Sequence, residues 1–295
     1  MRIFEPHAHM FSRVTDDYQQ MALAGIVAVL EPSFWLGQPR TSIGTFVDYF
    51  DTIIGWERYR AEQFGLRHYC TLSLNPKEAN DDRVNDGVMA LLPRYLEKDG
   101  VLGVGEIGFD DITEREERYL AAQLELARTH DLPALIHTPH RDKVRGVERT
   151  LAIMREVGFL PERTLIDHNT EQTVPLIVDS GCMMGFSIYP ETKMDEDRMV
   201  ALVRRYGAER IVINSAADWG ISDPLKVAKT AARMAASGID AATIETVVWR
   251  NPLAFFAQSG RLDVADLEAD LEIDQRELFE GNSVLRAGRK PFVHR

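Results

Sequence analysis

Short runs of mainly apolar residues alternate along the chain with longer segments in which apolar positions recur at a helical period. Such alternation is typical of parallel strands joined by helices. Eight runs have strand character, and they cover residues 2–9, 25–32, 66–74, 101–108, 132–139, 163–169, 181–189 and 209–218. Because eight strand-helix units over about 250 residues are what a closed barrel requires, the pattern predicts an α/β protein with a (β/α)8 TIM-barrel fold. A doubly wound open sheet is the alternative.

Two of the intervening segments carry the boundary signals of helices. Residues 113–130 begin with Thr113 and Glu116, the spacing of a capping box, in which each side chain satisfies a free backbone N–H at the helix start. Residues 223–238 begin with an Asp-Pro pair and end at a glycine, the usual start and stop residues. Both segments are therefore predicted as helices that cover the barrel.

The character of the chain changes after residue 260. Residues 262–281 hold eight acidic residues and one arginine, with leucines spaced to form a partial apolar stripe. We predict a barrel domain over residues 1–260 and a C-terminal extension over residues 261–295, in which an acidic helix packs on the outside of the barrel and a basic tail follows. A contact between subunits of a homo-oligomer is the alternative use of the acidic run.

Charge and composition narrow the range of partners. The 295 residues include 34 Lys or Arg and 46 Asp or Glu, a formal net charge of −12. Since proteins that bind nucleic acid through its phosphates usually carry a basic face, this balance disfavours nucleic acid and favours a small-molecule substrate. No apolar run reaches the roughly 18 residues of a membrane span. The first residues lack the order of a secretory signal, and the two cysteines fit a reducing compartment, so we expect a cytoplasmic protein.

His7 and His9 are separated by one residue at the end of the first predicted strand, in the sequence IFEPHAHMFS. Alternate residues of a strand point to the same side, so both imidazoles face one region of space. This arrangement suits a metal ion, although a pair of histidines at a strand end also occurs without one.

Further metal-ligand residues stand at the ends of other predicted strands. His137 follows the fifth strand and His168 the sixth, while Glu106 lies in the fourth and Asp218 follows the eighth. In parallel barrels this end of the strands carries the active site. Imidazole nitrogens and carboxylate oxygens are ligands of zinc, manganese and related divalent metals, so a ring of such residues predicts a metal site more specifically than the first histidine pair does.

The chain resembles the TatD-like metal-dependent hydrolases of the amidohydrolase superfamily. The resemblance rests on the first-strand HAH, on GEIGFD at residues 105–110, on QLELARTHDLPALIHT at 123–138, on the DHN that contains His168, and on the closing NPLAFF at 251–256. It covers about residues 3–258.

The resemblance implies a barrel with a site for two divalent metals. One metal is implied to lie among His7, His9 and Asp218, the other against His137 and His168, with Glu106 as the bridge between them. The implied reaction is hydrolysis of an ester, often a phosphoester, by a metal-activated water. One or two ions of Zn, Mn, Mg or Fe are the expected cofactors. Glu106 and Asp218 are the expected catalytic carboxylates, with Asp218 able to accept a proton from the water; a helix cap is the alternative role of Asp218.

Three segments depart from the family's pattern. Glu5 stands where Asp is typical, TPHRDK follows His137 where an arginine two residues on is common, and NSAADWG replaces the more usual ETDSP at the eighth strand. All three lie at substrate-facing ends. They therefore bear on the substrate, and on nuclease activity in particular, more than on metal binding.

Four residues near the site are candidates for binding substrate. His140, Arg141 and Lys143 follow the fifth strand and are suited to an anionic group, unless they form only the basic first turn of a solvated helix. Trp219 follows Asp218 and is suited to stacking on substrate or to filling the barrel mouth. Three rivals to the small-molecule esterase remain: an amidase or lactonase of the same superfamily, a non-catalytic scaffold that binds metal or ligand, and a TatD-type DNase.

Overall fold

The computed structural model describes residues 1–35, 37–189 and 191–269, and its eight parallel strands form one sheet in the order β1 to β8. The strands are β1 Ile3–Glu5, β2 Ile26–Pro32, β3 Arg67–Leu72, β4 Val101–Gly108, β5 Ala134–His137, β6 Thr164–Ile166, β7 Met183–Ser187 and β8 Ile211–Asn214. Each lies inside one of the eight predicted runs. The predicted (β/α)8 barrel is therefore confirmed, and the open sheet is excluded because the order never reverses.

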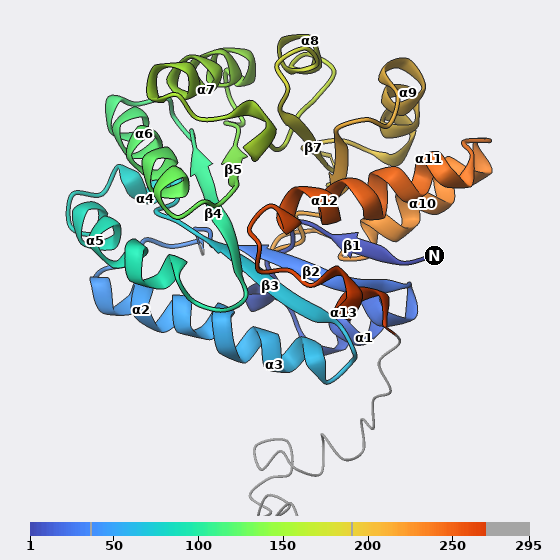
Figure 1. Ribbon diagram of the computed structural model, residues 1–295, viewed down its shortest axis with the longest axis horizontal. Coiled ribbons are helices and arrows are strands. Elements are labelled where there is room, and N and C mark those ends of the chain that lie inside the picture. The colour runs from blue at the N-terminus through green and yellow to red at the C-terminus, as the bar shows by residue number, and fades with distance from the viewer. Residues whose placement is uncertain (36, 190, 270–295) are drawn as a thin grey trace, which may run out of the picture.

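Helices surround the strands on the outside (Figure 1). They are α1 Thr15–Leu23, α2 Ile43–Asp51, α3 Glu57–Glu62, α4 Pro76–Ala79, α5 Asn85–Leu96, α6 Glu114–Thr129, α7 Lys143–Val157, α8 Val174–Ile177, α9 Glu196–Tyr206, α10 Lys226–Ala236, α11 Ala241–Glu245, α12 Asn251–Ala257 and α13 Val264–Glu268. The chain also forms π-helical turns at Thr52–Trp56, between α2 and α3, and at Thr246–Arg250, between α11 and α12.

Both helices with predicted boundary signals are present. The capping box at α6 is complete: the Thr113 side chain accepts a hydrogen bond from the Glu116 N–H, and the Glu116 side chain accepts one from the Thr113 N–H. The helix α10 begins at Lys226 instead of residue 223, because the Asp223 carboxylate accepts a hydrogen bond from the Leu225 N–H and holds a turn before the first helical residue. Gly238, at φ +81°, ends the segment as expected.

The seam between β8 and β1 is closed by the Glu5 side chain and by backbone hydrogen bonds beyond the strands. Within the described part of the chain, no strand pairing joins β8 to β1. The buried Glu5 carboxylate instead accepts hydrogen bonds from the N–H groups of His7 at 3.0 Å and Ser215 at 3.1 Å. Just beyond the strands, the Ala216 N–H donates to the His7 carbonyl and the His9 N–H to the Ala217 carbonyl. The departure of Glu5 from the family's pattern therefore lies at the barrel's seam, directly beneath the two histidines.

The closing NPLAFF segment seals the opposite end of the barrel. It forms α12, where the Asn251 side chain donates to the carbonyls of Ala208 at 2.8 Å and Ile211 at 2.7 Å and so ties the helix to the start of β8. Phe256 is fully buried and its ring lies 5.9 Å from that of Phe4 on β1. This end of the barrel is therefore packed with apolar side chains, whereas the candidate metal ligands lie at the C-terminal ends of the strands.

The first part of the predicted C-terminal extension packs on the barrel. Arg261 donates to the carbonyls of Leu96 and Val101, and Leu267 of α13 is 2% exposed. The rest of the acidic helix and the tail lie outside the described residues. The boundary at residue 260 and the extension as a separate unit remain predictions.

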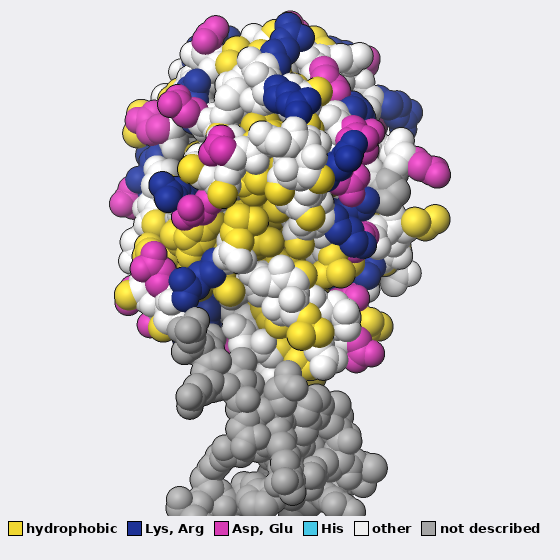
Figure 2. Space-filling model, turned by 90° about the vertical axis from the view of Figure 1, so that its right-hand side faces the viewer, with side chains coloured by type: hydrophobic (Ala, Val, Ile, Leu, Met, Phe, Trp, Pro, Cys, Tyr) yellow, Lys and Arg dark blue, Asp and Glu magenta, His cyan; other side chains and the backbone are white. Residues whose placement is uncertain are grey.

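The surface shows no simple electrostatic face on the side turned toward the viewer in Figure 2. There, Lys and Arg side chains are interspersed with Asp and Glu around a central area of hydrophobic side chains. None of the described helices is long and apolar enough to cross a membrane. A homo-oligomer, a cytoplasmic location and the absence of a nucleic-acid partner all remain predictions.

Candidate metal centre

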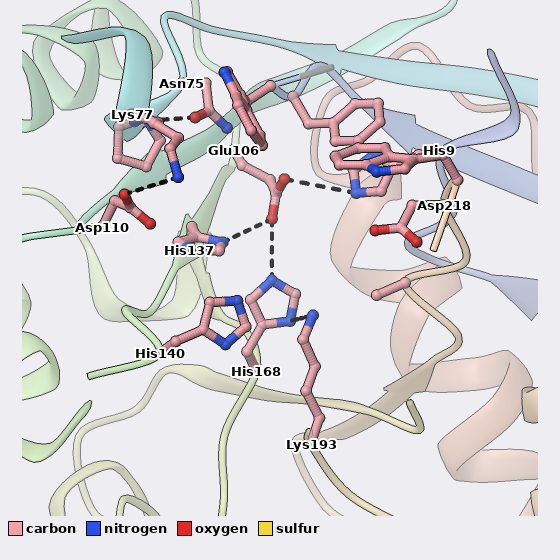
Figure 3. Close-up of a pocket in the computed structure, with 15 residues that line it drawn as sticks. His9, Asn75, Lys77, Glu106, Asp110, His137, His140, His168, Lys193 and Asp218 are labelled. Atoms are coloured by element: carbon pink, nitrogen blue, oxygen red, sulfur yellow. Dashed lines mark hydrogen bonds and ion pairs between the residues drawn. The ribbon is translucent and has the colours of Figure 1, made fainter. Parts of the chain in front are cut away.

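Predicted metal ligands from four strands gather at the C-terminal ends of the strands, where His9, Glu106, His137 and His168 line one pocket (Figure 3). Glu106 lies in β4 and His137 is the last residue of β5. His168 follows β6 by two residues, and His7 and His9 follow β1. Because all strands of the barrel run in parallel, ends far apart in the sequence reach the same opening.

Glu106 stands at the centre of this group. Its Oε1 atom lies 3.1 Å from His137 Nδ1, 3.1 Å from His168 Nε2 and 3.5 Å from His7 Nε2, while Oε2 lies 3.7 Å from His9 Nε2. Burial by itself raises the pKa of Glu106, but His7, His137 and His168 outweigh it and hold the pKa well below the usual value. The carboxylate is therefore ionised and available as a ligand.

A close approach of two strands places Glu106 there. A Cβ at Gly105 would lie 2.7 Å from the carbonyl oxygen and Cβ of Leu135, so only glycine allows β4 and β5 this close together. His137 on β5 consequently reaches Glu106 directly.

The first histidine pair presents two ring nitrogens to each other. The Nδ1 of His9 lies 3.2 Å from the Pro32 carbonyl, which only accepts, so this nitrogen carries the hydrogen. The Nδ1 of His7 lies 2.6 Å from the Asp167 carboxylate and donates in the same way. The two Nε2 atoms then face each other, 3.0 Å apart. Two neutral imidazoles would oppose their lone pairs at this distance, so a proton or a cation has to lie between them.

Asp167 holds the His7 ring through its outer nitrogen. It is fully buried and accepts hydrogen bonds from His7, from the His168 N–H at 2.7 Å, and from Asn214 Nδ2 at both oxygens. Burial raises its pKa, but His168 and His7 outweigh that effect and the net pKa is lowered. The ionised carboxylate therefore fixes the ring of His7, the usual way in which proteins orient a metal-binding histidine.

His168 is held from its outer nitrogen as well. Its backbone adopts φ +59°, a left-handed conformation rare for residues other than glycine, which turns the side chain toward Glu106. Its Nδ1 lies 2.6 Å from Ser187 Oγ on β7 and 3.3 Å from the Lys193 ammonium. The inner nitrogen, Nε2, is thus left directed at Glu106.

The donor set fits a divalent metal. Ligand atoms of His7, Glu106 and His168 all lie within 4.8 Å of one another, and the three residues are buried. The outer nitrogens of His7, His9 and His168 are occupied by hydrogen-bond partners, so their inner nitrogens converge on one carboxylate. Imidazole with carboxylate is the donor chemistry of zinc, manganese and iron sites, in which outer hydrogen bonds fix the ligands.

Asp218 lies in the pocket but apart from this cluster. Its Oδ1 accepts hydrogen bonds from the Tyr189 hydroxyl at 2.9 Å and the Gly220 N–H at 2.8 Å. Among the described residues, no histidine lies within hydrogen-bond or ion-pair distance of its carboxylate. Its role as a metal ligand remains a prediction, and Figure 3 shows it on the same side of the pocket as His9.

The four predicted substrate-binding residues are placed differently. His140 and Trp219 line the pocket. Trp219 is 49% exposed and stacks on Phe34 at 5.2 Å between ring centroids, and Phe34 stacks on His9 at 3.6 Å. Arg141 is exposed, and the Lys143 ammonium donates to Thr138 Oγ1 at 2.9 Å. These placements leave the predicted roles of all four untested.

Several residues of the site were missed by the sequence analysis. Asp167 stands next to His168 in DHN and could have been found from that position. Ser187 ends β7, the one strand between β4 and β8 to which no site residue was assigned. Phe34 and Lys193 come from loops, and no spacing in the sequence indicates that they reach the pocket.

Comparisons with known proteins agree with this geometry. Residues 12–257 match the family model described as TatD related DNase. The chain is 25% identical over 257 residues to an uncharacterized metal-dependent hydrolase of Methanocaldococcus jannaschii, covering 86% of this chain and 99% of the relative.

Solved structures share the fold. The TatD-like protein from Archaeoglobus fulgidus is 22% identical with a TM-score of 0.72, covering 86% of this chain and 99% of that one. A phosphotriesterase homology protein from Escherichia coli, complexed with phosphate in its active site, is 15% identical with a TM-score of 0.64, covering 86% and 98%. With the family model matching most of its length, this chain belongs to the TatD-related family of metal-dependent hydrolases.

Proposed function

We propose that this protein uses a metal-activated water to cleave an ester or phosphoester bond in a small molecule. The observation that carries the proposal is the pair of Nε2 atoms of His7 and His9, which face each other at 3.0 Å beside an ionised, buried Glu106. The two ring nitrogens need a proton or a cation between them, and a divalent metal is the cation for which imidazole and carboxylate together are usual ligands.

The buried ligands divide the work of the site. Divalent metal, when bound by His7, His9, Glu106, His137 and His168, supplies a water of lowered pKa and a Lewis acid for the attacked centre. Glu106, held by three histidines, would be a ligand of each ion if two were bound. The ion is Zn, Mn, Mg or Fe, and one or two are bound.

Asp218 is the candidate general base. Both of its hydrogen bonds fall on Oδ1, which orients the carboxylate, and within the described residues Oδ2 has no hydrogen-bond partner. That oxygen is free to accept a proton from the water. General bases must lie within hydrogen-bond reach of the proton that they remove, and Asp218 shares the pocket with the metal ligands.

The walls of the pocket favour a small substrate. Phe34, Trp35 and Trp219 form an aromatic side next to His9, and Trp219 packs edge-on against Trp35 at 5.9 Å. His140, Lys77 and Lys193 supply polar groups elsewhere in the lining. Such a mixture of apolar surface and few polar groups is typical of small-molecule sites. Together with the acidic net charge, it favours small-molecule esterase activity over nuclease activity.

The test begins with metal content. Protein purified without a histidine tag or added metal is measured by mass spectrometry, and we expect about one or two equivalents of zinc, manganese or iron per chain. Activity is then assayed on p-nitrophenyl phosphates, open-chain p-nitrophenyl esters, lactones, amides and single-stranded DNA with added Mn²⁺ or Zn²⁺. The proposal expects turnover of esters or phosphoesters that a chelator abolishes.

A double variant His7→Ala, His9→Ala provides the decisive comparison, with His130→Ala as the matched control. His130 follows α6, away from the pocket. We expect the double variant to lose metal and activity and the control to keep both. Activity retained in the double variant refutes the proposal. Turnover of lactones or amides alone favours the amidase or lactonase alternative, degradation of DNA favours the nuclease, and a metal-bound protein inert on every substrate favours the scaffold.

A further inference from the structure

Lys193 places an ammonium group in the pocket. It lies in the loop between β7 and α9, and its Nζ atom reaches the side of His168 that faces away from Glu106 (Figure 3). The loop is pinned on both sides, because the Met194 N–H donates to the Ser187 carbonyl at 3.1 Å and the Tyr189 N–H to the Met194 carbonyl at 3.1 Å. Its side chain is therefore aimed into the site by a fixed backbone.

This ammonium has few partners. Its neighbours are His168 Nδ1 at 3.3 Å and the Tyr189 ring, whose centroid lies 5.3 Å away. His168 Nδ1 already has the closer Ser187 hydroxyl at 2.6 Å. An ammonium carries three donors, and among the described residues no carboxylate lies within 4.0 Å of Lys193 Nζ.

Two other lysines do have a carboxylate partner, whereas Lys143 donates to Thr138 Oγ1. Lys77, also in the pocket lining, pairs with Asp110 at 3.5 Å, and Lys226 on α10 pairs with Glu196 at 2.7 Å. Burial lowers the pKa of Lys193 because an ammonium without a counter-ion is costly, and an anion bound beside it would stabilise the charged form. The missing counter-ion of Lys193 is therefore a property of the site that needs an explanation.

The carboxylates of the site do not supply it. Asp167 is occupied by His7 and Asn214, and Glu106 by His137 and His168. Their charges, with that of Asp218, act on Lys193 from a distance only. The open side of the ammonium faces the pocket, where a bound molecule can approach it.

We propose that Lys193 binds an oxyanion of the substrate, so that this enzyme selects esters that carry a phosphate or carboxylate group. The inference deepens the proposed function and rests on it for the reaction. An oxygen anion in the pocket would accept the unused N–H donors of Lys193 in charge-assisted hydrogen bonds, which are among the strongest in proteins. The rest of such a substrate would lie against the aromatic side formed by Phe34 and Trp219.

The test measures binding by calorimetry with two probes, phenyl phosphate and benzoate. Both carry an aromatic ring, and they differ in the oxyanion. Titrations use the full chain after removal of metal with a chelator and again after Mn²⁺ is restored, so that binding to Lys193 is separated from binding to metal. The variants are Lys193→Met, which keeps the length of the side chain, Lys193→Arg, which keeps the charge, and Lys226→Met as a control.

We expect Lys193→Met to weaken binding of the preferred probe about 10- to 100-fold in the metal-free protein, the range for hydrogen bonds to charged groups. Lys193→Arg should stay closer to the wild type, and Lys226→Met should match it. Preference for phenyl phosphate identifies the oxyanion as phosphate, and preference for benzoate identifies it as carboxylate. Equal affinity of Lys193→Met and the wild type overturns the inference, as does the failure of both probes to bind the wild type.

The outcomes also separate this inference from the proposed function. If the probes bind in a Lys193-dependent way but the protein hydrolyses no substrate, the oxyanion site is supported and the proposed hydrolase function is refuted. If Lys193→Met hydrolyses anionic esters with an unchanged KM, the hydrolase function is supported and the oxyanion site is refuted. Circular dichroism of Lys193→Met, Lys193→Arg and Lys226→Met is used to check that each variant keeps the fold.

Discussion

Replacement of Asp167 by asparagine tests whether the buried carboxylate beneath His7 positions the metal ligands. The substitution keeps the size of the side chain and removes its charge. In the wild type, four hydrogen bonds end on the two oxygens: one from His7 Nδ1 at 2.6 Å, one from the His168 N–H at 2.7 Å, and two from Asn214. An amide offers one acceptor oxygen and one NH2 group, so one side of the substituted side chain has to face donors.

The expected size follows from these contacts. The loss of a charged acceptor for His7 Nδ1, and with it the control of the ring's orientation, should weaken metal binding about 10- to 100-fold, as is usual for outer partners of metal ligands. This corresponds to about 1.4–2.8 kcal/mol. Because the site is fully buried, the donors left facing an NH2 group should also cost about 2–3 kcal/mol of folding stability in the metal-free protein.

Zinc affinity is measured by competition with a chromophoric chelator, and folding stability by urea denaturation of the metal-free chain. Asp110→Asn is the matched control, since Asp110 lines the same pocket, pairs with Lys77 and touches no histidine of the cluster. We expect the control to bind zinc as the wild type does. If Asp167→Asn also binds zinc with unchanged affinity, then Asp167 does not position His7 and the reasoning is wrong.

Two further predictions concern pH. Burial lowers the pKa of His7, but Glu106 and Asp167 outweigh this effect, so the net pKa lies above 6.5 and protons compete with metal for His7 below it. Zinc affinity should therefore fall about tenfold per pH unit below that pKa. A constant zinc affinity between pH 8 and 6 contradicts this prediction. Away from the site, burial raises the pKa of Glu31 to about 8, whereas burial lowers that of His68, 2.9 Å away, to about 4. Between pH 4.5 and 8 the folded chain keeps the Glu31 proton that the unfolded chain has lost, so the contribution of Glu31 to folding stability falls as the pH rises through this range. Between pH 6.5 and 4 the unfolded chain protonates His68 and the folded chain does not, so the contribution of His68 to folding stability falls as the pH drops through that range. Between pH 6.5 and 8 the Glu31 contribution keeps falling while the His68 contribution is constant, so Glu31→Gln should remove about 2 kcal/mol of the loss seen in urea denaturation. The buried Glu5, whose pKa is also raised to about 8, contributes to the loss in both proteins. Parallel curves for both proteins would refute the shift of Glu31.

The sequence by itself determined the architecture and most of the candidate ligands. Strands and helices of this fold are local patterns, since each strand is a short apolar run and each helix carries its own caps, as at Thr113 and Glu116. Once eight such units alternate, parallel pairing brings every strand end to one opening. His7, His9, Glu106, His137 and His168 could therefore be named from the sequence, because each stands at or just after the end of a strand.

Only the tertiary structure decided what surrounds those ligands. Asp167 meets His7 across 160 positions of the chain, and Lys193 reaches His168 from a loop whose path follows from its own hydrogen bonds. The Asp218 carboxylate lies with Tyr189 and Gly220 instead of the histidines, because the Tyr189 hydroxyl, from the loop after β7, and the Gly220 N–H both donate to it. Spacing along a strand predicts the direction of a side chain, but the partners that fix its hydrogen bonds come from other strands and loops, and packing of the whole barrel sets their distances.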